Sequence, residues 1–148
     1  MVMKVDFRKN DKINPRVFKE GVVRVGFFDT AKYDDDTYVA QVARWNEFGI
    51  GVPERPFMRP AVFEKKAELN AFLRSKYKQA IKDKKDTMKV LRLFGEKVVS
   101  EIQSQIWNGH YVRNAPSTIA RKGRNKPLID TEFMVNNVSY KAEEVKGL

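Results

Sequence analysis

Two runs of apolar residues at helical spacing constrain the fold of this chain more than any other feature. One run starts at Arg59, and the second follows Asp86 and stops at Asn108-Gly109. Apolar side chains recur every three or four residues in both, which places them on one face of a helix. The pattern predicts two long amphipathic helices, or one helix broken near 82–86. The apolar positions are Val62, Leu69, Phe72, Leu73, Ala80 and Ile81 in the first run, and Val90, Leu91, Phe94, Val98, Ile102 and Ile106 in the second.

Three shorter segments have the pattern of β-strands. Apolar residues alternate over 1–7, β-branched and aromatic residues fill 21–29, and 136–145 is strand-like again. A shorter helix is predicted over 37–48, with Thr37 as its N-cap and Gly49 as its stop. These elements predict an α+β fold, in which a small, mainly antiparallel sheet packs against two long amphipathic helices and one shorter helix.

The length of 148 residues fits a single domain, 1–148, with one hydrophobic core. Within it, residues 110–136 change in character, because prolines, glycine and positive charges interrupt any regular pattern. We expect this segment to be extended, with a short capped turn at Ser117 and Thr118. We also expect it to be mobile in the free protein and ordered by a partner.

The residue types available exclude several enzyme classes. The sequence has no cysteine, and His110 is its single histidine, so neither a zinc site of the usual His/Cys type nor a cysteine nucleophile can be built in one chain. No motif resembles a serine nucleophile turn. The consecutive acids Asp34 to Asp36 cannot all converge on one ion, so we interpret them as a solvated turn. We therefore expect no enzymatic activity, no metal and no cofactor.

The chain has no apolar segment near the roughly 20 residues needed to cross a bilayer, and its first residues lack the apolar block of a secretion signal. We therefore expect a soluble intracellular protein without membrane contact.

Positive charge is concentrated in one segment. The formal net charge is +10, and residues 59–92 hold 11 Lys or Arg against 4 Asp or Glu, a net +7. Such a stripe can bind phosphates with release of counterions, or it can be the solvated face of a helix. A second basic patch has two equally weighted interpretations, namely contact with a partner or plain solvation. It consists of Arg121, Lys122, Arg124 and Lys126.

One ordered set of motifs resembles a known family. "VARWNEFG" (42–49) is followed by "VPERPFMRPA" (52–61), by the two helical runs and then by "STIARKGRNKPLIDT" (117–131). In this order, over roughly 38–140, the motifs resemble the tail-completion or neck proteins of long-tailed bacteriophages. This group is similar to the minor tail protein Z of lambda-like phages and to the virion-morphogenesis proteins of Mu-like phages. A glycine commonly follows Asp-Thr in that family, whereas this chain has Glu132.

The resemblance implies a structural virion protein that finishes the head-proximal end of the tail and supports head–tail joining. Its implied partners are further copies of itself in a hexameric ring, and neighbouring tail-terminator, tail-tube or head–tail connector proteins. Incidental contact with DNA in the lumen is a further implication. The implied location is the host cytoplasm during assembly and the virion afterwards. The alternative function is a nucleic-acid-binding module that uses the 59–92 stripe.

The proline-rich stretch after Gly49 suits the presentation of an interface, because prolines fix the backbone and arginines form paired hydrogen bonds with carboxylates. Phe57 leaves two interpretations open: an anchor for the next subunit, or a residue of its own core. The predicted interface residues are Trp45, Phe48, Arg55, Phe57, Arg59, Lys126 and Asp130.

Overall fold

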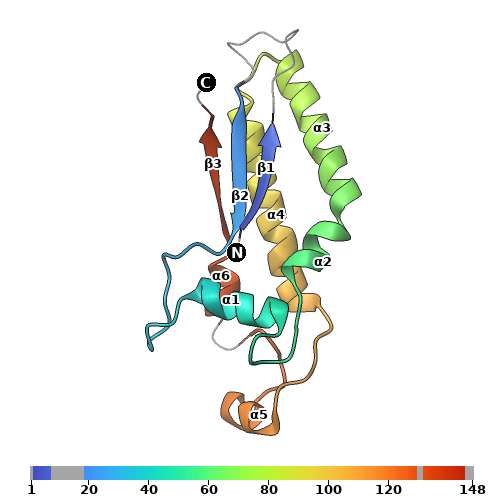
Figure 1. Ribbon diagram of the computed structural model, residues 1–148. Coiled ribbons are helices and arrows are strands. Elements are labelled where there is room, and N and C mark those ends of the chain that lie inside the picture. Colours follow the sequence, from blue (N-terminus) through green and yellow to red (C-terminus); the bar gives the residue numbers. More distant parts are fainter. Residues whose placement is uncertain (1, 8–18, 130–131, 146–148) are drawn as a thin grey trace.

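The computed structural model describes residues 2–7, 19–129 and 132–145, which form a mixed α+β fold. The predicted fold class is confirmed. Figure 1 shows an elongated molecule, with the sheet and the two long helices in its upper half and the shorter helices towards its lower end. The strands are β1 (Val2–Phe7), β2 (Gly21–Gly26) and β3 (Ser139–Glu144), and the helices are α1 (Val39–Phe48), α2 (Met58–Phe63), α3 (Lys66–Lys82), α4 (Met88–Asn108), α5 (Pro116–Lys122) and α6 (Phe133–Asn136).

The sheet is antiparallel, with β2 between β1 and β3. Val23 pairs with Val5 on one side and with Ala142 on the other, so β2 uses the hydrogen-bonding groups of both its edges. Val23 and Val25 are fully buried, because α4 covers the face of the sheet to which they point (Figure 1). The β-branched valines that mark this segment in the sequence therefore belong to the central strand.

The helix α4 lies along one face of the sheet and buries Phe94 and Val98 there. Gly95 makes the close approach possible, since a Cβ atom at this position would lie 2.5 Å from Cδ2 of Tyr140 in β3. A glycine inside a helix costs about 1 kcal/mol relative to alanine. Packing of the Tyr140 ring directly onto the helix offsets that cost.

The two predicted long helices correspond to α3 and α4, and the chain breaks between them near the charged stretch 82–86. A second break, after Phe63, corrects the prediction of one continuous helix from Arg59. Residues 64–66 are exposed and polar, so the apolar stripe skips a turn there. The chain turns a corner at this point, and α2 and α3 run in different directions (Figure 1).

The helix α1 begins one residue later than predicted. Tyr38 is its N-cap residue, and no side chain caps it. Thr37 does not cap because it belongs to the preceding turn: its carbonyl accepts the N–H of Tyr33 (2.9 Å), and its own N–H donates to Asp35 Oδ1 (3.0 Å). Gly49 ends the helix with a left-handed φ of 67°, as predicted. The helix lies across the end of the sheet at which β3 begins (Figure 1).

The extended conformation predicted for 110–136 is wrong for two parts of that segment, which form α5 and α6. Pro116 stands in the first turn of α5, where its missing N–H is not needed, and Gly123 ends the helix at a φ of 70°. The helix α5 projects at the lower end of the molecule (Figure 1).

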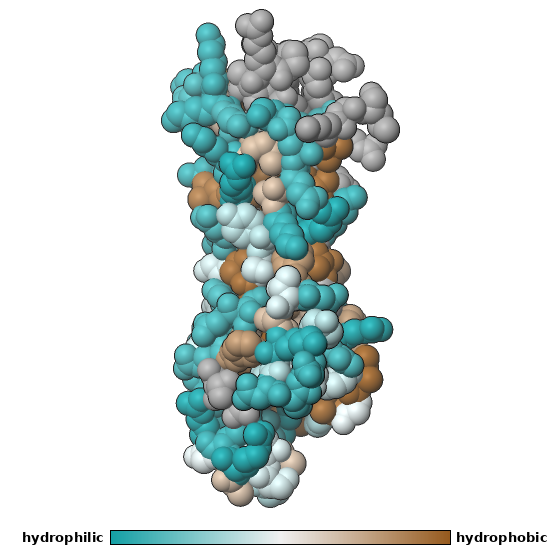
Figure 2. Space-filling model, turned by 90° about the vertical axis from the view of Figure 1, so that its left-hand side faces the viewer, coloured by the Kyte–Doolittle hydropathy of each residue, from teal (hydrophilic) through white to brown (hydrophobic). Residues whose placement is uncertain are grey.

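The visible surface is mostly hydrophilic. Figure 2, which faces the left-hand side of Figure 1, shows apolar patches separated by polar side chains. In the part of the chain that the structure describes, no helix combines the length and apolar character that crossing a membrane requires.

Candidate interaction surface

A carboxylate at the end of α1 organises the loop that follows it. Glu47 is 0% exposed. Its side-chain oxygens accept hydrogen bonds from the backbone N–H groups of Phe57 (2.7 Å), Met58 (3.0 Å) and Arg59 (2.9 Å). These groups lie at the start of α2, where N–H groups lack acceptors within the helix. Glu47 therefore caps α2 from a distance in sequence, and we call this arrangement the Glu47 clamp.

Arg59 completes the Glu47 clamp. Its Nε donates to Glu47 Oε1 (3.0 Å), and one Nη donates to the main-chain oxygen of Glu47 and to Glu54 Oε1, each at 2.6 Å. Hydrogen bonds raise the pKa of Arg59 above its ordinary value, and the bond to Glu54 contributes more than the bond to Glu47. The guanidinium also lies 5.1 Å from the centre of the Phe48 ring. Charge pairing of this kind makes the burial of a carboxylate tolerable.

Arg55 connects the same loop to a distant part of the chain. Its side chain is 7% exposed. The Nε donates to the main-chain oxygen of Val112 (2.9 Å), and the Nη groups donate to that of Arg113 (3.2 Å) and to Asn46 Oδ1 (3.3 Å). Burial lowers the pKa of Arg55 from its usual value. Because all three acceptors belong to its own chain, Arg55 fixes residues 112–113 against the end of α1.

The structure corrects two of the predicted interface residues. Phe57 is 0% exposed, and its ring meets that of Phe27 edge-on, with centroids 5.9 Å apart. The core interpretation of Phe57 is therefore confirmed in this chain. Arg55 likewise points into its own domain, because the carbonyls of 112–113 provide its acceptors. Arg59 is exposed, with 45% of its side chain accessible, although it also binds Glu47 of its own chain.

Three of the other predicted interface residues are more accessible, and the fourth is not described by the structure. Trp45 is half-buried, Phe48 and Lys126 are exposed, and Asp130 lies outside the described residues. Two further exposed apolar side chains follow α1. These are Ile50 and Val52, and together with Phe48 they form what we call the apolar strip.

Residues 110–129 form an arm that leaves the end of α4, carries α5 and returns to the core (Figure 1). Contacts within the chain hold its base. Arg55 binds the carbonyls of 112–113, the N–H of Asn114 donates to Asn125 Oδ1 (3.1 Å), and Ile129 is fully buried. The position of the arm is therefore fixed at both of its ends.

The tip of the arm is different, because no residue of α5 is buried. Part of the predicted basic patch supports the arm itself: Lys122 Nζ donates to the main-chain oxygen of Ile129 (3.1 Å), and Lys126 Nζ lies 4.6 Å from the centre of the Trp107 ring. Arg121 and Arg124 are exposed. The structure thus places all four patch residues on the arm.

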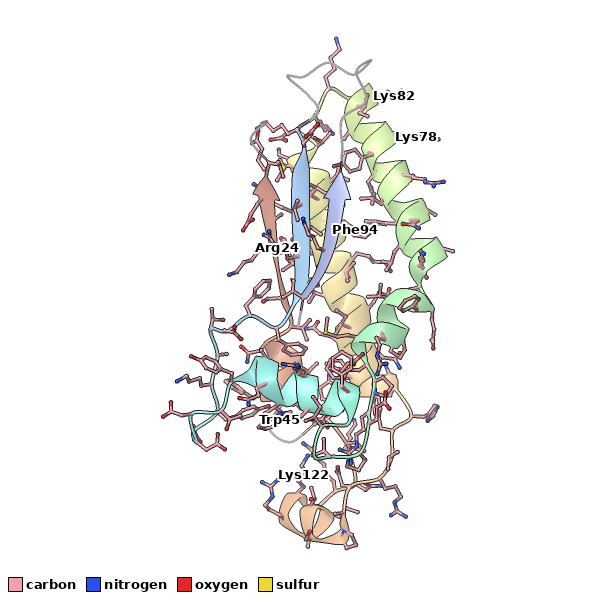
Figure 3. All side chains as sticks on the ribbon, in the orientation of Figure 1. Arg24, Trp45, Lys78, Lys82, Phe94 and Lys122 are labelled. Atoms are coloured by element: carbon pink, nitrogen blue, oxygen red, sulfur yellow. The ribbon has the colours of Figure 1, made fainter. Side chains whose placement is uncertain are left out.

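A groove of about 670 Å³ lies between α1 and the arm. We call it the α1–α5 groove. Figure 3 shows Trp45 on the side of α1 that faces α5, and Lys122 on α5 opposite it. Its walls combine apolar side chains with charges of both signs, and its volume is in the range of sites that bind ligands or peptides. The lining includes Val42, Trp45, Val52, Pro53 and Leu128, the acids Asp34 and Asp35, and the cations Arg121 and Lys122.

The helix α3 presents a row of cations to solvent. Arg74, Lys78 and Lys82 follow one another every four residues, so they lie on one ridge, about 6 Å apart along the helix axis. All three are exposed, and Figure 3 shows Lys78 and Lys82 directed away from the sheet. Among the residues that the structure describes, none of the three forms an ion pair. We call them the α3 row.

The acids Asp34 to Asp36 form an exposed turn, as predicted. The backbone N–H of Thr37 donates to Asp35 and lowers the pKa of that carboxyl, and Asp36 pairs with Lys32 (3.1 Å). Within the described ranges, no three acidic or histidine side chains are grouped so that they would hold a metal ion.

The sequence interpretation omits Glu47, the residue on which the loop depends. A usable signal exists, since an acid at a helix end is followed by a proline-flanked helix start ten to twelve residues later. It also omits Ile129, which is fully buried and anchors the return of the arm.

Comparison with known proteins does not place the chain in a family. No protein-family model, no curated protein and no solved structure matches it. The resemblance to phage tail-completion proteins therefore stays a prediction.

Proposed function

We propose that this protein is a structural subunit of a tailed-bacteriophage virion. In this proposal, it is a tail-completion or neck protein that forms a ring of six copies at the head-proximal end of the tail. It contacts a tail-terminator, tail-tube or head–tail connector protein, and it supports head–tail joining without catalysis.

The observation that carries this proposal is the arm. Its base is fixed by the buried side chains of Arg55 and Ile129, whereas no residue of α5 is buried. Thr118, Ile119 and Lys122 are half-buried and the rest of α5 is exposed, so this helix can bury further surface only against another molecule. The apolar strip reaches the same region, because Val52 also lines the α1–α5 groove. Different surfaces of this kind suit the head-to-tail contacts of a ring.

A detail of the backbone also supports the resemblance. The related phage proteins commonly have glycine after Asp-Thr, where this chain has Glu132. Glu132 adopts a φ of 65°. Left-handed backbone is the conformation that favours glycine over other residues. The turn after residue 131 therefore has the geometry for which a glycine is suited.

The proposal is tested by replacing residues 116–121 of α5 with a Gly-Ser linker of equal length, which keeps Lys122 and its hydrogen bond to Ile129. The native protein is expected to form a ring alone or on purified tail tubes, and the variant to remain a folded monomer. Size-exclusion chromatography with light scattering over a concentration series measures both. A native protein that stays monomeric at every concentration and never joins tails contradicts the proposal.

A second candidate function is sequence-independent binding of nucleic acid by the α3 row. Three exposed cations on one ridge can each neutralise a phosphate, and the released counterions make the affinity fall with salt. Replacement of Arg74, Lys78 and Lys82 by glutamine is expected to reduce the slope of log affinity against log salt by about 3 on random duplex DNA. Lys32→Gln, at the other end of the molecule, is the control. An affinity that does not depend on salt contradicts this candidate.

A further inference from the structure

One large apolar side chain is far more exposed than the rest. Phe63 ends α2 and is 72% exposed, the largest value among the exposed apolar side chains of the described residues. Burial of a phenylalanine is worth roughly a tenfold to hundredfold gain in an association constant. Within its own domain, Phe63 stays mostly exposed and therefore gains little free energy from burial.

The residues that follow Phe63 carry charges of both signs. Glu64, Lys65 and Lys66 are all exposed, because the chain breaks between α2 and α3 here. Lys65 pairs with Glu68 of its own helix (3.3 Å). Among the described residues, Lys66 forms no ion pair. We call residues 63–66 the α2–α3 corner: an apolar ring beside one acid and two cations.

The α1–α5 groove has the complementary features. Trp45 and Leu128 line it and offer apolar contact to a phenyl ring, and its volume of about 670 Å³ leaves room for the neighbouring residues as well. Asp34 and Asp35 provide acids for Lys66, and the cations of α5 provide partners for Glu64. Complementary charges of this kind fix the register of an interface more than they add affinity.

The corner and the groove of one molecule do not meet. Figure 1 shows the corner at the right-hand edge and α5 at the lower end, on the far side of α1. We propose that the α2–α3 corner of one copy docks in the α1–α5 groove of the next, with Phe63 as the anchor. Two different patches that meet make a heterologous contact, which closes into a ring when the rotation permits. This inference rests on the proposed ring and names the surfaces that build it.

The lack of cysteine in the chain allows a direct test. Lys65→Cys, which keeps the anchor Phe63, and Val52→Cys single variants, mixed and oxidised, are expected to form a disulfide-linked dimer, because Lys65 lies in the corner and Val52 lines the groove. The double variant is expected to give a ladder of larger species, since each copy then carries both partners. Leu93→Cys, 40% exposed on α4, is the matched control and should give at least about tenfold less dimer with Val52→Cys. Equal yields from the two pairs, or dimers without a ladder, overturn the inference.

A charge exchange tests the register. Asp34→Lys and Lys66→Asp are each expected to weaken assembly about tenfold at low salt, and the two together are expected to restore it. A double variant that assembles no better than either single variant contradicts the proposed pairing of Asp34 with Lys66.

The outcomes also separate this inference from the proposed function. A native chain that assembles while the Lys65→Cys and Val52→Cys variants form no adduct contradicts the docking and leaves the ring standing. A native chain that remains monomeric under all conditions, without adduct, contradicts both.

Discussion

Two irregular segments of this protein look alike in sequence and differ in structure. Residues 49–59 and the arm, 110–129, both combine prolines, cations and scattered apolar residues. In the first segment, Arg55 and Arg59 find acceptors inside their own domain, whereas α5 of the arm buries no residue. The difference teaches that a basic, proline-rich segment is structural where its own chain supplies buried acceptors. Where its side chains stay largely exposed, as on α5, such a segment is available to a partner.

The largest expected effect comes from removing the buried acceptor. Glu47→Ala removes the buried one of the two carboxylates that pair with Arg59 and leaves three backbone N–H groups without an acceptor. We expect a loss of about 3–5 kcal/mol in the free energy of unfolding. Glu54→Ala, which removes the exposed partner of Arg59, should cost less than about 1 kcal/mol. Urea unfolding of both variants measures the difference, and equal losses would show that the buried acceptor matters no more than the exposed one.

Arg55→Ala tests the connection between the segments. The variant loses three hydrogen bonds and leaves carbonyls of 112–113 without their donor, so we expect a loss of about 2–3 kcal/mol. Hydrogen exchange of residues 110–115 should also become faster, because the base of the arm is no longer held. Arg113→Ala, at an exposed neighbour, is the control. Unchanged exchange in the Arg55 variant would show that the arm holds its place without this contact.

The general fold could be predicted because it depends on local periodicity. The apolar stripe from Val90 to Ile106 specifies one face of α4, and the valines of 21–26 specify a strand. The break between α2 and α3, after Phe63, could also be predicted from the sequence. Lys65 and Lys66 stand three and four residues after Val62, where a continuous stripe would need apolar side chains.

The contacts that fix the site could not be predicted in the same way. Arg55 binds carbonyls 57 and 58 residues further along the chain, and no local pattern specifies such a distance. The same holds for the order of the strands, since β3 joins β2 only after the whole helical part has been placed. The burial of Phe57 and Arg55 likewise depends on contacts with residues distant in sequence and not on residue type.

A smaller effect, an increase in stability, is expected at Glu132, after the arm has returned to the core. Glu132→Gly relieves a left-handed backbone that costs a non-glycine residue about 1–2 kcal/mol, and glycine gives back part of this through its greater freedom when unfolded. We expect a net gain of about 0.5–1 kcal/mol. Asp36→Gly, at a φ of 64°, should gain less, because aspartate tolerates this conformation better. A loss of stability in the Glu132 variant would show that its side chain matters more than its backbone.

The smallest effect on stability is expected at the tip of the arm. Because no residue of α5 is fully buried and the linker variant of 116–121 keeps Lys122, this variant should unfold within about 0.5 kcal/mol of the native protein, although it removes most of the helix. Thermal unfolding of the monomers measures this. Hydrogen exchange then gives the other half of the comparison: amides of 116–122 should exchange fast in the free native protein and slow on assembly, while those of 57–59, bound to Glu47, stay protected in both. Equal protection of 116–122 in the two states would contradict ordering of the arm by a partner, and would make the arm as much a part of the domain as the Glu47 clamp.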